Sequence, residues 1–149
     1  MAIPLAAIAA TSRAVASTSK RTAKVAALAE LLRRCDPADA PAVVGLLTGQ
    51  PRQGRIGVGW SNLQQLDPDI ARDVTIDRMS VADLDAALTD IAALHGPGSQ
   101  RARAEALQRI AVATDGDERD FVRRVLGGEL RQGANAGVVT DAIARARGL

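Results

Sequence analysis

Apolar residues recur every three or four positions along most of the chain, and polar residues fill the positions between them. This spacing is typical of amphipathic α-helices that bury one face against a core. Short groups of Gly, Pro, Ser and Asp separate the periodic stretches, as expected for caps and turns. The pattern predicts helices over residues 3–15, 20–34, 60–66 and 136–146, and four more that begin at Asp36–Pro37, Ser80, Ser99 and Asp115.

Three of the predicted helix starts depend on cap residues. Ser17-Thr18-Ser19 precedes the helix over 20–34 and offers hydroxyl groups for an N-cap. Ser80-Val81-Ala82-Asp83 matches a capping box, with Asp in place of the usual Glu. Ser99 is expected to cap the helix that follows it. Residues 67–79 form a polar stretch that we expect to be a linker, helical in part.

Composition supports an all-α protein. Ala, Leu, Val and Ile dominate, and Trp60 and Phe121 are the only aromatic residues among 149. Ala and Leu favour helix, whereas strands are enriched in aromatic and β-branched side chains. A chain of this length is typical of one domain. We therefore expect a single helical domain over residues 1–149, with about eight to ten helices.

The helical pattern occurs twice. Arg52-Gln53-Gly54 matches Arg131-Gln132-Gly133 after a shift of about 79 positions, and the same shift pairs Gly49 with Gly128. Apolar positions before both turns coincide as well. We interpret this as an internal duplication, with one unit over about 20–66 and the other over about 99–147. Two related units are expected to pack about a pseudo-two-fold axis, by analogy with symmetric dimers.

Charge is unevenly distributed along the chain. Acidic residues outnumber basic ones between Asp67 and Asp90, so the remaining chain carries more than the overall net charge of +2. Nearly all of the basic residues are arginine, whose planar guanidinium binds phosphate through two parallel hydrogen bonds. A solvated surface rich in arginine is an equally ordinary explanation, so composition alone does not identify a partner.

The cysteine content and the N-terminal residues argue against an extracellular or membrane location. Cys35 is the single cysteine, so neither a disulfide framework nor a zinc cluster is expected, and a reducing, cytoplasmic setting fits. Residues 1–10 are apolar, but no basic segment precedes them and Arg13 soon interrupts them. They match neither a signal peptide nor a membrane span.

Residues suited to catalysis are few. His95 lies beside Gly-Pro-Gly at a helix end, where it is more typical of a cap than of a base, and Cys35 fits a small core residue. Gly57 and Gly59 lack the spacing of a dinucleotide-binding loop, and the chain contains no phosphate-binding Gly-x-x-x-x-Gly-Lys sequence. We therefore expect no catalytic residue and no metal ligand in this chain.

The two Arg-Gln-Gly turns are better candidates for a site. Each combines an arginine, an amide and glycines just before a helix, and a helix N-terminus is a ready anion site. Glycine also lets the backbone approach a phosphate closely. Alternatively, the glycines are C-caps and the arginines are merely solvated. For one isolated turn we favour that alternative. Two matching turns reverse the preference, because each turn can then contact the phosphates of one strand of a duplex.

Three blocks of sequence resemble a known family. They are Thr18-Ser19-Lys20-Arg21 before a Leu-rich helix, Ile56-Gly57-Val58-Gly59, and above all the run from Gly128 to Ala134. Their order and separation are similar to those of the N-terminal DNA-binding domain of bacterial-type ATP-dependent DNA ligases, over essentially the whole chain. The resemblance implies an all-helical domain with internal pseudo-two-fold symmetry that grips nicked duplex DNA through the minor groove. It also implies adenylation and OB-fold domains as partners within the parent enzyme.

The chain departs from the family's catalytic sequence. In the family, a lysine in Lys-x-Asp-Gly-x-Arg takes the AMP group, but here Lys20 is followed by Arg-Thr-Ala and Lys24 by Val-Ala-Ala. The resemblance therefore implies a binding domain from which the adenylation and OB-fold domains are absent. ATP and Mg belong to the parent enzyme, which would seal nicks in replication, repair or recombination, and the isolated domain is expected to be a monomer in the cytoplasm, associated with the nucleoid.

The two turns supply the residues that we expect to contact DNA. The acidic stretch over 67–90 should point away from DNA because like charges repel. The expected contacts, which read phosphates and groove shape without base specificity, are Arg52, Gln53, Gly54, Arg55, Gly57, Gly59, Arg131, Gln132, Gly133, Ala134 and Asn135, with Lys20 and Arg21 in a second tier.

A protein-interaction module is the rival hypothesis. Paired helices rich in Ala and Leu also suit a two-unit array of the HEAT type, which would bind protein and not DNA. That hypothesis leaves the duplicated Arg-Gln-Gly turns unexplained. Salt-dependent binding to duplexes of random sequence distinguishes the two, because only the DNA-binding hypothesis predicts it.

Overall fold

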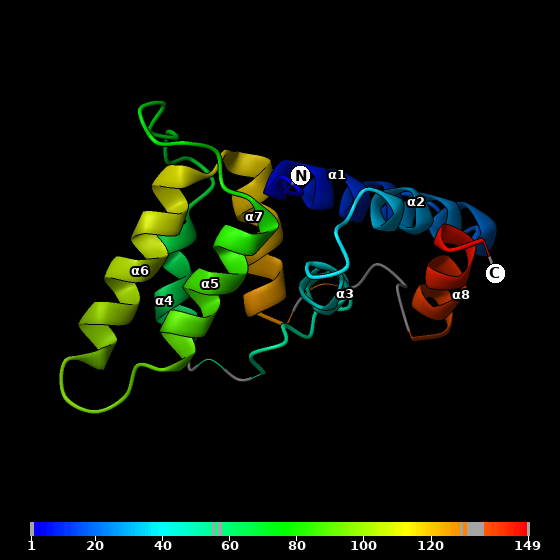
Figure 1. The fold of residues 1–149 in the computed structure, drawn as a ribbon. Helices are drawn as coiled ribbons and strands as arrows, with labels where there is room; N and C mark the ends of the chain where they lie inside the picture. Colours follow the sequence, from blue (N-terminus) through cyan, green and yellow to red (C-terminus); the bar gives the residue numbers. More distant parts are fainter. Residues whose placement is uncertain (1, 55, 57, 129, 131–135, 149) are drawn as a thin grey trace.

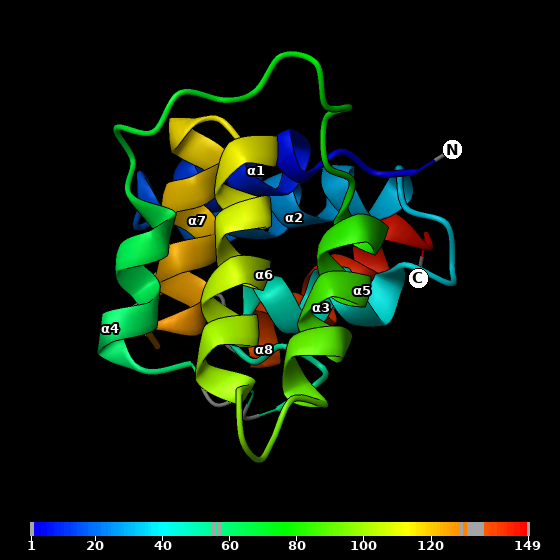
Figure 2. The same ribbon diagram turned by 90° about the vertical axis from the view of Figure 1, so that its left-hand side faces the viewer.

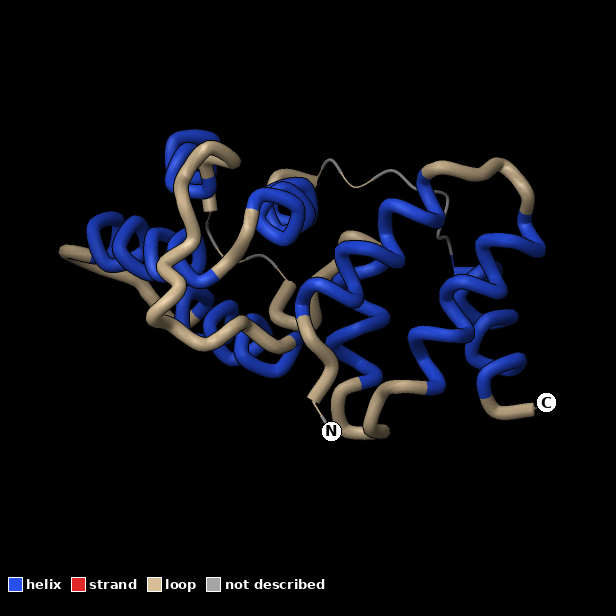
Figure 3. Tube along the Cα trace, turned by 90° about the horizontal axis from the view of Figure 1, so that it is seen from above, coloured by secondary structure: helices blue, strands red, loops and turns tan. Residues whose placement is uncertain are grey.

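The computed structural model describes residues 2–54, 56, 58–128, 130 and 136–148. Figure 1 shows the helices formed by these residues, and Figure 3 shows only helices and loops among them. An antiparallel bridge between Pro4 and Ser80 is the one extended pairing in the described ranges. The elements are α1 Leu5–Ala16, α2 Arg21–Arg33, α3 Ala40–Leu47, α4 Trp60–Leu63, the 3-10 helix η1 Gln64–Leu66, α5 Val81–Ala92, α6 Ser99–Ala113, α7 Gly116–Leu126 and α8 Ala136–Ala146. The prediction of an all-α, single-domain protein is confirmed.

The apolar periodicity in the sequence corresponds to the buried faces of the helices. On α5, the four residues Val81, Leu84, Leu88 and Ile91 recur at helical spacing and all are buried. They belong to one continuous core to which every α-helix from α1 to α3 and from α5 to α8 contributes. In Figure 2, α6 lies between α4 and α5 and packs on both. Burial of these apolar faces is the main contribution to stability.

The capping box predicted at Ser80 is present, and α7 begins with a second capping box that was not predicted. Ser80 Oγ accepts the Asp83 N–H at 3.0 Å, and Asp83 accepts the Ser80 N–H at 2.9 Å. Asp115 and Glu118 form the same reciprocal pair at the start of α7, with both distances 2.9 Å. Each capping box pairs two N–H groups that a helix start would otherwise leave without a partner.

The other cap predictions are wrong. Lys20, and not a residue of Ser17-Thr18-Ser19, is the N-cap of α2, and its side chain makes no capping hydrogen bond. Thr18 Oγ1 instead accepts the Lys20 N–H at 3.2 Å and shapes the preceding turn. At α6, Gly98 is the N-cap with φ of 82°, and Ser99 is already helical. The left-handed backbone at Gly98 reverses the chain, so no side-chain cap is used.

Helix α3 begins later than predicted. The Asp36 carbonyl accepts the Asp39 N–H at 2.9 Å, which closes a turn over the Asp36–Pro37 start that the sequence suggested. Asp39 is the N-cap, and Pro41 occupies the first turn of the helix. Proline fits that position because an N–H in the first turn has no intrahelical acceptor.

Residues 67–79 contain no helix, so the expectation of partial helix is wrong. The segment consists of turns, and Val74 at its tip is 81% exposed. Its first residues are held by the Arg119 side chain, which is completely buried and donates to the carbonyls of Asp67, Pro68 and Ile70 at 2.7–3.1 Å. These side-chain bonds replace the backbone bonds that a helix would have made.

Helix packing is reciprocal between two halves of the chain, the first containing α1 to η1 and the second α5 to α8. The second helix of the first half, α2, packs on α8, while α6 packs on α4 and η1. In the same way α1 packs on α7, and α5 packs on α3. Exchange of equivalent contacts is the signature of a two-fold interface. Figure 1 shows α2 beside α8 on one side of the molecule and α6 beside α4 on the other.

The reciprocal pattern includes α1 and α5, which the sequence comparison placed outside the units over 20–66 and 99–147. The Leu5 N–H donates to the Met79 carbonyl at 3.0 Å, and the Val81 N–H donates to the Ile3 carbonyl at 2.8 Å. In each hydrogen bond, the residue after one bridging residue donates to the residue before the other, so the two sides of the Pro4–Ser80 bridge are equivalent. A helix of 12 residues starts directly after each bridging residue. The bridge therefore relates α1 to α5.

No helix in the described ranges has both the length and the apolar character that crossing a membrane requires.

Candidate nucleic-acid interface

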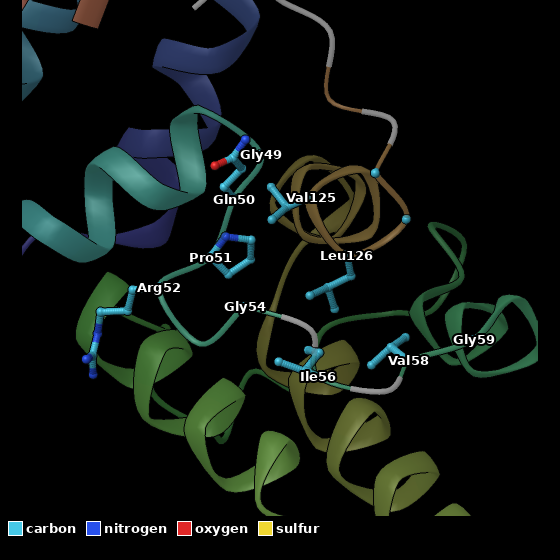
Figure 4. Close-up of a pocket in the computed structure, with 12 residues that line it drawn as sticks. Gly49, Gln50, Pro51, Arg52, Gly54, Ile56, Val58, Gly59, Val125 and Leu126 are labelled. Carbon is cyan, nitrogen blue, oxygen red and sulfur yellow. The ribbon is translucent and has the colours of Figure 1, made fainter. Parts of the chain in front are cut away.

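A groove of about 910 Å³ lies between the loop after α3 and the C-terminal end of α7. Figure 4 shows the loop running past Pro51 and Gly54 toward Val58, with Val125 and Leu126 of α7 on the opposite wall. The groove is therefore formed by the two matching segments of the duplication. The ends of two equivalent helices meet at one surface, although they are far apart in the sequence.

Glycines in the left-handed conformation end both helices. Gly49 has φ of 74° and Gly128 has φ of 70°, and the N–H of each donates to the carbonyl three residues before it. Each directly follows the C-cap of its helix, Thr48 in α3 and Gly127 in α7, at the position where a left-handed glycine commonly ends a helix. A Cβ on Gly49 would lie 3.6 Å from the Leu130 Cβ, so the end of α3 touches the segment after α7.

Gly54, one of the predicted contact residues, has an accessible backbone. Its φ is 70°, its N–H donates to the Pro51 carbonyl at 2.9 Å, and a Cβ placed on it would meet no atom within 4 Å. Gly54 is exposed on the wall of the groove. A ligand can therefore approach this stretch of backbone as closely as a phosphate requires.

Gly45 packs beneath the loop that lines the groove, and the sequence analysis did not single it out. A Cβ at this position in α3 would lie 2.8 Å from the Gln50 carbonyl oxygen and 3.2 Å from the Arg52 backbone nitrogen. The loop therefore lies directly against α3, and only glycine leaves room for it. Its sequence signal was a glycine within an otherwise apolar helix, which often marks close backbone approach.

Arg52 is paired with a carboxylate of α5. Its Nε lies 2.9 Å from Asp85 Oδ1, and its Nη2 lies 2.7 Å from Asp85 Oδ2. This is the two-pronged geometry that makes arginine–carboxylate pairs strong. The Arg52 side chain is 53% exposed and that of Asp85 is 18% exposed. Asp85, one of the carboxylates of the acidic stretch over 67–90, therefore contacts the first turn, and the expectation that this stretch points away from DNA stays a prediction.

Gln53 attaches the same loop to α5. Its Nε2 donates to Asp85 Oδ1 at 2.7 Å, to the Asp85 carbonyl at 3.0 Å and to Thr89 Oγ1 at 3.0 Å. We call the cluster of Arg52, Gln53, Asp85 and Thr89 the turn latch. It joins two side chains of the predicted first turn to two side chains on one face of α5.

The turn latch changes the acidity of its carboxylate. The hydrogen bond from Arg52 lowers the pKa of the Asp85 carboxyl below its ordinary value and outweighs partial burial, which acts in the opposite direction. The hydrogen bond from Gln53 adds to the lowering. A carboxyl with a depressed pKa stabilises the folded state when it is ionised.

Stability should therefore depend on pH through Asp85. Its contribution is complete above the pKa of an unfolded aspartate, about 3.9, and is lost as the pH falls through the lower value of the folded state. We expect the parent to be more stable than Asp85→Ala at pH 7, and the difference to shrink as the pH falls below about 4. Urea unfolding of both proteins at several pH values measures this difference. A difference that stays constant across the range would contradict the prediction.

The remaining predicted contacts lie in several environments. Lys20 and Arg21 are exposed at the start of α2, as expected, and Arg21 Nη2 lies 2.6 Å from Asp141 Oδ2 of α8. The Gly59 N–H already donates to Asn62 Oδ1 at 3.2 Å, so this N–H is occupied by the cap of α4. The predicted contacts Arg55, Gly57, Arg131, Gln132, Gly133, Ala134 and Asn135 lie outside the described residues.

Neither of the residues considered for catalysis belongs to a catalytic arrangement. His95 is exposed, and its Nδ1 lies 2.8 Å from the Ala93 carbonyl just beyond the end of α5. Cys35 is half-buried and its thiol donates to the Leu31 carbonyl at 3.3 Å. Burial raises the pKa of this thiol, which makes it less reactive. In the part of the chain that the structure describes, no three His, Cys, Asp or Glu residues are grouped to hold a metal ion.

Comparison with known proteins gives a consistent set of matches. The family model described as DNA ligase N terminus matches residues 71–144. A probable DNA ligase from Pseudarthrobacter chlorophenolicus is 53% identical over 136 residues, which cover 91% of this chain and 26% of the relative. Probable DNA ligases from Rhodococcus jostii and Streptomyces griseus are 45% and 46% identical, over 95% and 97% of this chain and 28% and 27% of their own lengths. The chain thus spans about a quarter of the length of these relatives.

Proposed function

Because the chain belongs to the DNA ligase N-terminus family, we propose that it binds duplex DNA through the phosphate backbone and the minor groove, without reading the base sequence. In this role it is the DNA-holding part of an ATP-dependent ligase that seals nicks. Such a function places it on chromosomal DNA in the cytoplasm.

The observation that carries the proposal is the groove formed by two equivalent helix ends. The C-terminal ends of α3 and α7 meet there, and Gly49 and Gly128 adopt the same backbone conformation. Duplex DNA has a dyad of its own, so a protein with reciprocal halves can present one segment to each strand. Backbone near Gly54 and the basic start of α2 at Lys20 and Arg21 provide the kinds of groups that contact phosphate.

Ligation would require the rest of the parent protein. The residues of this chain do not fit an AMP-accepting site, because neither Lys20 nor Lys24 lies in Lys-x-Asp-Gly-x-Arg. We assign ATP, Mg and the chemistry of sealing to the remaining three quarters of a ligase of the relatives' size. This chain would contribute affinity for nicked duplex, in replication, repair or recombination.

Binding should be insensitive to base sequence and sensitive to salt. The candidate groups are arginines, lysines and backbone amides, which bind phosphate, and few side chains suit base edges. We expect affinities for unrelated duplexes to agree within about threefold, and log affinity to fall linearly with log salt concentration. Fluorescence anisotropy with several duplexes over a salt series measures both. A preference of about a hundredfold for one sequence would contradict the proposal, since that requires specific contacts with bases.

The rival function is a helical module that binds protein. The same anisotropy series distinguishes it, because a protein-interaction module shows no duplex binding even at low salt. A separate question is whether the isolated domain recognises the nick. Nicked and intact duplexes of one sequence are matched probes for it. Equal affinity for both would assign nick recognition to the other domains of the ligase.

A further inference from the structure

The Arg52 side chain is directed out of the groove. Figure 4 shows it extending from the loop toward α5, on the side away from Ile56 and Leu126. There it borders a second hollow, whose walls include the carboxylates Asp39 and Asp85. Two nearby negative charges repel a phosphate. The surroundings of Arg52 therefore suit an internal ion pair better than the phosphate contact that the sequence predicted.

The loop that carries Arg52 is held from two sides. On one side its backbone lies against Gly45 of α3, where the Gln50 carbonyl oxygen leaves no space for a Cβ. On the other side Arg52 and Gln53 bond to Asp85 of α5. Gly54 follows immediately and presents open backbone to the groove. The position of that backbone is therefore fixed by contacts that do not themselves face the groove.

The turn latch joins the loop after α3 in the first half to α5 in the second half, and its two α5 side chains have no counterparts in α1. The Pro4–Ser80 bridge aligns α1 with α5, so that Asp85 corresponds to Ala9 and Thr89 to Arg13. Alanine offers no acceptor, and an arginine donates hydrogen bonds but accepts none. Helix α5 of the second half thus carries a carboxylate where the equivalent helix of the first half, α1, has a methyl group. A general requirement of the fold would have placed the same residue in both halves.

Building on the proposed function, we propose that Asp85 is a positioning residue for DNA binding, and that Arg52 and Gln53 are its hydrogen-bond donors in the latch. Asp85 holds the loop against α5 and thereby fixes the Gly54 backbone at the wall of the groove. Arg52 contributes to binding through this ion pair, and the phosphate is contacted by the backbone that the pair positions.

Removal of Asp85 gives opposite results under the two roles of Arg52. If Arg52 contacts phosphate, Asp85→Ala frees a cation and strengthens duplex binding. If the latch positions the loop, Asp85→Ala weakens binding by about fivefold, in spite of the lost negative charge. Asp90→Ala is the matched control, because Asp90 is exposed on the same helix and lies outside the latch. The control measures the general electrostatic effect of removing one carboxylate from α5.

Exchange of the two charges tests the pair directly. Arg52→Asp and Asp85→Arg each place like charges together, so each should weaken binding. The double variant restores opposite charges, and the Gln53 amide can rotate to accept from the new donor. We expect the double variant to recover most of the affinity. A phosphate contact at position 52 predicts no recovery, because the double variant has an acidic group there.

The salt dependence provides the decisive measurement. Loss of one phosphate contact makes the slope of log affinity against log salt shallower by about 0.9. We expect Arg52→Gln to lower affinity while the slope stays within about 0.3 of the parent value. A shallower slope for Arg52→Gln, tighter binding by Asp85→Ala or no rescue in the double variant would each overturn the latch. Absence of duplex binding by the parent would overturn the proposed function and this inference with it, so the two failures are distinguishable. Thermal melting of each variant shows that the protein is folded at the temperature at which its affinity is measured.

Discussion

Replacement of Arg119 by methionine is expected to lower the free energy of unfolding by about 4 kcal/mol. Hydrogen bonds from a buried charged group are stronger than those between neutral groups, and their loss leaves several buried carbonyl oxygens without a donor. The Arg119 side chain is fully buried, and its guanidinium donates to the carbonyls of Ala111, Asp67, Pro68, Ile70 and Thr114. Methionine has a similar length but donates no hydrogen bond. For a domain of this size the melting temperature should fall by roughly 12 °C.

A matched control separates this effect from the loss of a charge. Arg124 lies on the same helix and pairs with Asp120 at 2.9 Å, but its side chain is 56% exposed. Arg124→Met should therefore change stability by less than about 0.5 kcal/mol. Calorimetry of the two variants measures the difference, and Arg119→Lys should resemble Arg119→Met because an ammonium lacks the planar fork. A loss below about 1 kcal/mol for Arg119→Met would show that the buried guanidinium does not hold the 67–70 segment.

Replacement of Gly45 by valine is expected to cost about 3 kcal/mol and to weaken duplex binding by the protein that remains folded. The added Cβ would lie 2.8 Å from the Gln50 carbonyl oxygen and 3.2 Å from the Arg52 nitrogen. Both neighbours are backbone atoms, so rotation of a side chain cannot relieve the clash. The loop must move off α3, and the Gly54 backbone moves with it.

Gly137 provides the stability control, because it is an exposed glycine within α8. Gly137→Val adds the same side chain at an exposed helical position, and its effect should remain within about 0.5 kcal/mol. Thermal melting and duplex binding, measured for Gly45→Val and the parent, test the two consequences separately. Equal melting temperatures for Gly45→Val and the parent would show that the loop does not rest on α3.

The helices could be predicted because their signal is local. The residues Val81, Leu84, Leu88 and Ile91 define a buried face at helical spacing, and the capping box at Ser80 fixes its start. Some starts without a side-chain cap were misassigned, whereas the start of α4 at Trp60 was predicted correctly. At Gly98 the chain turns through left-handed backbone, and no propensity of the neighbouring Ser99 reveals that geometry.

The candidate site was only partly predictable because its contacts join distant residues. The sequence singled out Arg52 and Gly54, and the structure places both in the loop beside the groove. Their relation to Asp85, 33 residues after Arg52, depends on how α5 packs against α3. Arg119 gave no signal either, because the shift that aligns the two turns pairs it with Ala40. Comparison of the two copies identifies the residues that both halves share, but it does not reveal contacts made by residues that occur in one half only.

The reciprocal packing also bears on how the protein is made. Arg21 of α2 and Asp141 of α8 bond across 120 residues of sequence, so these neighbouring helices belong to opposite ends of the chain. All-helical proteins with mainly local contacts fold fastest, and closure of so long a loop slows folding. At ordinary rates of translation, α2 leaves the ribosome roughly ten seconds before α8. During that interval the face of α2 that receives α8 has no partner, and exposed apolar surface of this kind favours aggregation of the nascent first half.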